Sequence, residues 1–385
     1  MSQSIEVVIP VHDVQRPFKR AASSALDQRS ELSRLGVELR VTVVLHNLGG
    51  AAGDTTAASA AGNEFDGVTW LACDDGVRSP AGPRNLALDE STATFLSFLD
   101  SDDYLEPGSL AAWWKAAQPD SASVVIAPLR TPEGSILPAP RIRPSKPAVL
   151  DPLKDGLAYR SVPYGLLRRS ALTNTGFRYA EGMRTGEDIE ATLKLWFRSG
   201  PVRYPYGAPA YQQTDDSGAG RVTSSLTNLA DELQWLERLL DSVWLQQAAL
   251  SERRAVALKI LRVHGIGALL RRGAPAGAAG AAGLPDDALW NETERSYWAD
   301  ISSRLYAFAS GSLPELSRRD AELTQAAAAA ADVQSLRTAV ERHRSTGRLG
   351  DLVPVAPAAI LSRDSVLRHY LTERLRARAG VFSRS

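Results

Sequence analysis

Residues 94–103 read TFLSFLDSDD, and this segment decides the fold. Its six mostly apolar residues predict a buried strand, and the carboxylates that follow directly predict that the strand ends at a polar site. Comparable apolar runs are found elsewhere in the first half of the chain, at 5–11 (IEVVIPV), 40–45 (RVTVVL), 68–72 and 123–129 (SVVIAPL). Helical signals separate these runs, at 17–28, from Pro83 onward, and at 107–118.

Apolar strands that alternate with helices indicate an α/β domain with a mostly parallel sheet covered on both faces. Right-handed crossovers place the carboxyl ends of such strands along one edge, where open α/β sheets bind ligands. We therefore expect Asp100 to Asp103 to lie at the binding edge of a Rossmann-like sheet.

The sequence changes character at about residue 226. Helical spacing of apolar residues predicts helices at 228–272, 286–309, 314–344 and 365–378, with a Gly/Ala/Pro connector at 274–285. We expect a first domain at 1–225 and an α-helical C-terminal domain at 226–385. The sequence leaves three roles open for the second domain: ordering an acceptor, forming a homo-oligomer, or making peripheral contact with a membrane through its basic last helix.

Composition excludes several classes of protein. Lys+Arg and Asp+Glu both total 44, so no net charge favours binding to nucleic acid. The single cysteine, Cys73, has no partner within the chain for a disulfide. No apolar run approaches the roughly 18 residues of a membrane span, and the start of the chain lacks the pattern of a secretion signal. These features predict a soluble, cytoplasmic protein.

The acidic cluster Asp100-Ser101-Asp102-Asp103 is the first candidate site. Three close carboxylates repel one another unless a cation or hydrogen-bond donors relieve the charge. Hard cations such as Mg²⁺ or Mn²⁺ take oxygen ligands and complete their shell with phosphate and water. The other interpretation is a polar turn that caps the next helix.

Glu187-Asp188 is the second candidate site, directly before an amphipathic helical pattern. A carboxylate at a helix start meets the positive end of the helix dipole and stays ionised. An ionised carboxylate suits a general base, which accepts a proton from a hydroxyl group. The alternative is a first-turn acid that stabilises its own helix.

The order of these motifs resembles family 2 glycosyltransferases with the GT-A fold. In that family a G-x-x-x-A-R-N helix start precedes F-L-D-x-D-D, and here GPRN at 82–85 precedes FLDSDD at 98–103. VIPV at 8–11, YGLLRRS at 164–170 and the Glu187-Asp188 pair also match in order. The resemblance covers about residues 4–225.

This resemblance implies a role for each matching residue. Asp102 would be the principal ligand of Mn²⁺ or Mg²⁺, with Asp103 a second ligand or an organiser of the turn. Asp188 would be the catalytic base and Glu187 its orienting neighbour. The remaining residues implied to lie at the donor pocket are Pro10, Val11, Asp13, Arg84, Asp100 and Ser101.

Two segments depart from the family pattern. His46-Asn47 stands where the family has an acidic run that reads uracil, although the Asn47 amide can still bind a base edge. Residues 211–218 lack the family's aromatic-Arg-His pattern. Asp215, Asp216 or Arg221 would have to supply a metal or diphosphate contact there, unless the segment is only a glycine-rich loop.

The resemblance implies an inverting transfer of sugar from a nucleotide-sugar, with a UDP-sugar as the first expectation. The acceptor would be a hydroxyl of a glycan, a wall polymer or a lipid-linked molecule in bacterial polysaccharide synthesis. Two alternatives stay open. One is a non-catalytic relative that binds sugar nucleotides or glycans. The other is a sugar nucleotidyltransferase, which the absence of glycine from residues 10–16 disfavours.

Overall fold

The computed structural model describes residues 3–48, 66–215, 226–274 and 289–382. Its contacts divide the chain into two compact units, Met1–Gly220 with Arg376–Ser385, and Arg221–Leu375. Residues 376–382 thus belong to the first unit, whereas the sequence predicts two domains that are each one continuous segment. The expected boundary at 225/226 falls next to residues outside the described part and stays a prediction.

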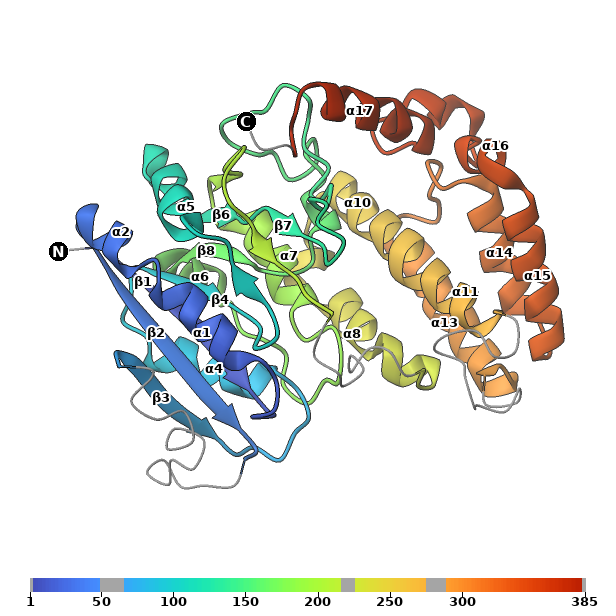
Figure 1. The fold of residues 1–385 in the computed structure, drawn as a ribbon. Helices are drawn as coiled ribbons and strands as arrows, with labels where there is room; N and C mark the ends of the chain where they lie inside the picture. Colours follow the sequence, from blue (N-terminus) through green and yellow to red (C-terminus); the bar gives the residue numbers. More distant parts are fainter. Residues whose placement is uncertain (1–2, 49–65, 216–225, 275–288, 383–385) are drawn as a thin grey trace. The chain divides into compact units, whose positions relative to one another are not determined.

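A seven-stranded sheet forms the centre of the first unit (Figure 1). In sheet order its strands are β3 (Val68–Cys73), β2 (Val37–His46), β1 (Gln3–Val11), β4 (Phe95–Phe98), β8 (Gly165–Arg168), β6 (Val124–Ile126) and β9 (Val202–Arg203). β1 to β4 are mutually parallel, and only β8 runs antiparallel to its neighbours β4 and β6. The predicted mostly parallel sheet is confirmed.

Helices cover both faces of this sheet. One face packs on α1 (Phe18–Leu26), α2 (Arg29–Arg34) and α5 (Ser109–Ala117), with Trp113 fully buried in the shared core. On the other face α4 (Ala81–Glu90) packs against the first three strands. Figure 1 shows α1 and α4 on opposite sides of the sheet. The alternation of side chains along each strand thus gives two buried faces, as the apolar strand sequences require.

A second, three-stranded sheet lies beside the acidic turn that follows β4. Its order is β5 (Tyr104–Leu105), β10 (Tyr211–Gln212) and β7 (Leu129–Arg130). The prediction of a single strand at 123–129 is wrong. The chain passes from β6 in the main sheet to β7 in the small sheet at Ala127-Pro128, because proline has no N–H to continue a ladder. The small sheet brings the Tyr211 hydroxyl to the residue that follows Leu99 at the end of β4.

Among its described residues the first unit also contains α6 (Arg169–Thr175) and α7 (Ile189–Arg198). The end of the last helix, α17 (Val366–Arg378), also belongs to it through Arg376. The Arg376 guanidinium donates to the backbone carbonyls of Arg141, at 2.8 Å, and Ile142. Phe382 packs edge-on against Tyr204, with ring centroids 5.9 Å apart.

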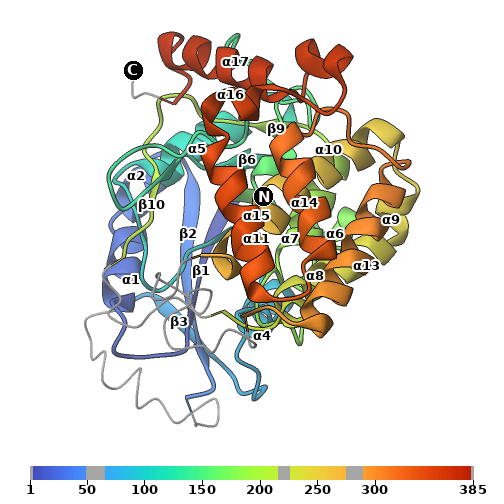
Figure 2. The ribbon, with the colours of Figure 1, turned by 90° about the vertical axis from the view of Figure 1, so that its right-hand side faces the viewer.

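The described part of the second unit is helical (Figure 2). Its helices are α8 (Leu229–Asp241), α9 (Val243–Gln246), α10 (Leu250–Ile260), α11 (Ile266–Arg272), α13 (Glu292–Phe308), α14 (Arg318–Ala329), α15 (Val333–Ser345) and α16 (Gly347–Leu352), with a π-helical turn at Leu261–Gly265 between α10 and α11. Buried Arg272 joins α11 to Glu232 of α8, at 2.7 Å, and to Glu294 of α13, at 3.3 Å. The predicted helical C-terminal region is confirmed.

Within the described residues, none of the helices combines the length and apolar character that crossing a membrane requires.

Candidate active site

The carboxyl ends of β1 to β4 meet at one edge of the main sheet, because these strands are parallel. The acidic turn follows β4 at this edge, as the sequence predicts. Asp103 points into the protein and is 5% exposed. Its two carboxylate oxygens accept hydrogen bonds from the Tyr211 hydroxyl, at 2.8 Å, and the Thr214 N–H, at 2.9 Å. Asp103 thus links the turn to Tyr211 and Thr214, and its implied role as a second metal ligand or an organiser of the turn stays a prediction.

Two neighbouring carboxylates, those of Asp100 and Asp102, act on the buried Asp103. Burial, together with the neighbouring charges of Asp100 and Asp102, raises the pKa of the Asp103 carboxyl to about 7. A cation bound at the turn would relieve this repulsion. The turn therefore offers the carboxylate oxygens that a hard divalent cation prefers as ligands.

The Asp102 carboxylate faces an arginine that the sequence analysis missed. Arg16, in the loop after β1, forms an ion pair with it at 2.6 Å, with 13% and 16% of the two side chains exposed. The Asp102 backbone carbonyl accepts hydrogen bonds from Arg20 and from the Thr214 hydroxyl. Arg16 thus supplies a positive charge where the resemblance implies a metal ion.

Asp100 lies at the centre of a second network. Its carboxylate accepts hydrogen bonds from Arg84 and from the Tyr164 hydroxyl, both at 2.6 Å, and its N–H donates to the Tyr211 hydroxyl at 3.0 Å. The rings of Tyr164 and Tyr211 stack, with centroids 4.3 Å apart. Neither tyrosine is predictable as a site residue from sequence, because their contacts join segments far apart in the chain.

Arg84 connects the two predicted sites. It is buried on α4, and its guanidinium reaches Asp100 at 2.6 Å and Glu187 at 3.1 Å. Burial alone would lower the pKa of Arg84, but the charges of Asp100 and Glu187 outweigh it and raise that pKa. The neighbouring Asn85 donates to the Tyr179 carbonyl at 3.0 Å. The Arg-Asn pair thus holds the loop before α7 against α4.

The Glu187-Asp188 pair lies where α7 begins, as the sequence predicts. Gly186, with φ of 75°, makes the left-handed turn before the pair, a conformation that favours glycine. Burial raises the pKa of Glu187, and the Arg84 charge opposes that shift. Asp188 is half-buried and directly precedes the first residue of α7. Burial raises the pKa of the nearby Tyr179, and the negative charge of Asp188 raises it further.

The end of β1 contributes three predicted residues. Pro10 and Val11 are buried in the last two positions of the strand, opposite Val44 and Leu45 of β2. Asp13 follows in the loop, where its carboxylate accepts the Gln15 N–H at 2.8 Å. Ser101 is buried in the acidic turn, at 2% exposure. Their donor-binding roles stay predictions.

Asn47 uses its side chain within the protein. It has a left-handed backbone (φ 53°), its amide oxygen accepts the Gly76 N–H at 2.9 Å, and its amide nitrogen donates to the Val77 carbonyl at 2.9 Å. These bonds join the ends of β2 and β3. Its predicted contact with a base stays a prediction. Arg221 and Asp216 lie outside the described residues, while Asp215 is exposed.

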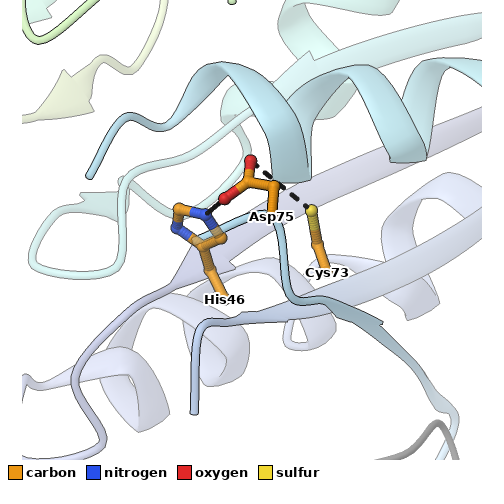
Figure 3. A group of neighbouring side chains, drawn as sticks. All are labelled: His46, Cys73 and Asp75. Carbon is orange, nitrogen blue, oxygen red and sulfur yellow. Dashed lines mark hydrogen bonds and ion pairs between the residues drawn. The ribbon is translucent and has the colours of Figure 1, made fainter. Parts of the chain in front are cut away.

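His46, Cys73 and Asp75 form a further cluster at this edge, which the sequence analysis did not predict (Figure 3). His46 is buried at the end of β2, and its Nε2 lies 2.9 Å from an Asp75 carboxylate oxygen. Pairing of β2 with β3 in register brings the three together.

The main sheet is mostly parallel and has an acidic turn at its carboxyl edge. One arginine joins this turn to a carboxylate pair at a helix start. Together these features define a GT-A-type fold. Residues 6–176 match the model of glycosyl transferase family 2, the family that the order of the motifs resembles. The expected family is thereby confirmed.

Known relatives are similar over parts of the chain. The poly(ribitol-phosphate) beta-glucosyltransferase of Bacillus spizizenii is 22% identical over 120 residues, which are 31% of this chain and 19% of that protein. The poly(ribitol-phosphate) beta-N-acetylglucosaminyltransferase TarS of Staphylococcus aureus is 23% identical over 139 residues, 36% and 24% of the two chains. The matches thus span less than a quarter of these relatives.

Solved structures are similar over most of the chain. The crystal structure of S. aureus TarS 1-349 in complex with UDP-GlcNAc has a TM-score of 0.68 at 15% identity, covering 89% of this chain and 92% of that one. The complex of the same fragment with UDP has a TM-score of 0.64 at 16% identity, with the same coverage. These similarities confirm the fold, including the helical region.

Proposed function

We propose that this chain is an inverting glycosyltransferase that moves a sugar from a UDP-sugar to a hydroxyl group of a polyol-phosphate polymer. The observation that carries the proposal is the continuous network from Asp100 through Arg84 to Glu187, next to Asp188. This network couples the acidic turn to a carboxylate at a helix start within a family 2 domain. The names of the relatives support a hexose-type sugar and a poly(ribitol phosphate)-like acceptor.

Asp188 is the proposed base. Its carboxylate takes the proton from the acceptor hydroxyl as that oxygen forms a bond to the anomeric carbon of the donor. The bond from this carbon to the diphosphate breaks on the opposite face, and UDP leaves with the electron pair. Arg84 and Glu187 are positioning residues that hold the loop of Asp188.

Asp102 would hold a divalent cation, Mn²⁺ or Mg²⁺, with Asp100 and Asp103 contributing negative charge behind it. When bound, such an ion supplies charge neutralisation for the diphosphate leaving group. Arg16 contributes a second positive charge beside the same carboxylate. Pro10, Val11 and the end of β2 would line the pocket of the nucleobase.

The test is release of UDP from UDP-glucose and UDP-N-acetylglucosamine, with Mn²⁺ and with poly(ribitol phosphate) as acceptor. Asp188→Asn should abolish transfer while UDP binding, measured by calorimetry, is nearly unchanged. Glu190→Gln, in the first turn of the same helix, is the matched control and should keep wild-type turnover. Retention of most of the activity by Asp188→Asn would refute the assignment of the base.

The same experiment distinguishes the alternatives. Donor binding without turnover on any glycan or polymer acceptor would favour the non-catalytic relative. Release of pyrophosphate from a nucleoside triphosphate and a sugar phosphate would instead identify a nucleotidyltransferase. Either result would overturn the proposed transfer.

A further inference from the structure

The cluster of His46, Cys73 and Asp75 has the chemistry of a metal site that is separate from the acidic turn. His46 is the last residue of β2 and Cys73 the last of β3, and the two are directly opposite in the ladder. Asp75 follows two residues later and turns back toward both, as Figure 3 shows. The acidic turn follows a different strand, β4.

The potential ligand atoms converge. The His46 Nε2 lies 2.9 Å from the Asp75 Oδ1, and the Cys73 Sγ lies 4.0 Å from the Asp75 Oδ2. One ligand atom from each residue lies within 4.8 Å of the others. Bonds of about 2.0–2.3 Å to a tetrahedral zinc ion separate its ligands by roughly 3.5 Å, so small side-chain movements would complete the site.

Surrounding groups hold Asp75 in place. Its Oδ1 accepts hydrogen bonds from the Val77 N–H, at 2.9 Å, and from the Asn47 amide, at 3.3 Å. Such outer partners orient the ligands of metal sites. With Oδ1 held in this way, Oδ2 is the oxygen that faces the thiol.

The first turn of α4 packs tightly behind the cluster at Gly82. A Cβ atom there would lie 1.9 Å from the Asp75 Oδ2 and 3.3 Å from the Cys73 Sγ. Glycine at this position therefore leaves the space that the carboxylate and the thiol occupy. Any larger residue would push Asp75 out of its place.

We propose that His46, Cys73 and Asp75 bind a divalent cation of the zinc class at the ends of β2 and β3. One imidazole, one thiolate and one carboxylate suit Zn²⁺ or Co²⁺, whereas Mg²⁺ and Mn²⁺ prefer oxygen ligands. The two negative ligands balance the charge of the ion, and water completes the tetrahedron.

The thiol must lose its proton when the ion binds. Burial and the charges of Asp75 and Asp74 raise the pKa of Cys73, so the sulfur is protonated in the metal-free protein. The bound cation provides the opposite charge that stabilises the thiolate. The ion would join β2 to β3 beside the proposed nucleobase pocket, but its binding does not depend on sugar transfer.

Cobalt provides a direct test, because a thiolate ligand gives Co²⁺ a charge-transfer absorption band and tetrahedral coordination gives it intense visible bands. The full chain is freed of metal with a chelator and titrated with Co²⁺, then with Zn²⁺ in competition. We expect both sets of bands at one equivalent, and their loss as Zn²⁺ replaces Co²⁺. Absence of the charge-transfer band at saturating Co²⁺ would overturn the proposal.

Variants assign the ligands. Cys73→Ser should remove the charge-transfer band, and Asp75→Asn and His46→Gln should each weaken Co²⁺ binding at least about tenfold, the scale seen when even outer partners of metal ligands are removed. Asp89→Asn is the matched control, because Asp89 is exposed in the last turn of α4 and pairs with Arg178, and this variant should bind Co²⁺ like wild type. Wild-type affinity in both Asp75→Asn and His46→Gln would refute the three-residue site.

Two further measurements separate this site from the proposed active site and from effects on folding. Asp102→Asn should keep the charge-transfer band even if it abolishes transfer, because the acidic turn offers only oxygen ligands. Zn²⁺ should raise the Tm of the wild type and leave that of Cys73→Ser nearly unchanged. Serine is close in size to the half-buried cysteine and preserves the packing. An equal rise in both proteins would place the ion elsewhere.

Discussion

The guanidinium of Arg16 lies 2.6 Å from the carboxylate of Asp102, in the position where the family resemblance implies a metal ion. The acidic turn is thus partly neutralised by the protein's own cation. A divalent ion that binds Asp102 has to replace this contact or share the carboxylate with it. The affinity for metal in the absence of donor therefore depends on Arg16.

Arg16→Gln should tighten donor-free binding of Mn²⁺. The expected gain is roughly fivefold, the factor for an ion pair of about 1 kcal/mol that no longer has to be given up. Isothermal calorimetry with Mn²⁺ alone measures it. Arg34→Gln, which removes one positive charge from α2 of the same unit, should leave the affinity unchanged. Equal or weaker binding by Arg16→Gln would show that the ion pair does not compete with metal.

Asp103 should make the metal-free protein less stable as the pH rises. Its folded-state pKa is raised to about 7, above the usual carboxyl pKa of about 4, so the folded protein holds a proton that the unfolded chain releases. Its contribution to stability is therefore complete below about pH 4 and is lost as the pH rises through about 7.

Thermal unfolding between about pH 5 and 8 tests this prediction. Asp103→Asn cannot titrate, so the fall of its Tm with pH should be shallower than that of the wild type. Asp27→Asn, a change at an exposed carboxylate, should keep the wild-type slope. Parallel curves for the wild type and Asp103→Asn would show that Asp103 is ionised throughout this range.

Arg84 should be needed for both stability and turnover. Arg84→Gln leaves Asp100 and Glu187 without their shared cation, and loss of one partner from a buried charge network costs about 3–5 kcal/mol. Arg84→Lys should recover part of the free energy of unfolding but little turnover, because an ammonium lacks the planar fork that reaches two carboxylates.

Urea unfolding and UDP release measure the two effects of the Arg84 changes. Arg178→Lys is the control, since Arg178 pairs with Asp89 at an exposed position. Full turnover in Arg84→Lys would mean that charge alone, without the bridging geometry, orients the loop of Asp188.

The main sheet and the acidic turn could be predicted because their signals are local. The apolar run that ends at Asp100 is contiguous, and parallel topology then places the turn at the binding edge. The Glu187-Asp188 pair was predictable for the same reason, since it directly precedes an amphipathic helix. The order of the motifs, which matches that of the family, indicated that the two sites belong to one active site.

The remaining contacts depend on long-range packing. Tyr211 lies 108 residues from Asp103, on a two-residue strand too short to show any periodicity. Arg16 is one of many arginines, and only the course of the loop after β1 brings it to Asp102. The His46–Cys73–Asp75 cluster requires the register of β2 against β3, which sequence spacing does not reveal.

The return of the chain end to the first unit yields the last prediction. Arg376 is 5% exposed, and it donates to the carbonyls of Arg141 and Ile142. Arg376→Ala would leave these acceptors without their donor, at a cost of about 1–3 kcal/mol in the free energy of unfolding. Arg374→Ala, on the same helix but bonded to Tyr370 at the surface, is the matched control. If urea unfolding gave equal values for the two variants, the Arg376 contact would not stabilise the first unit.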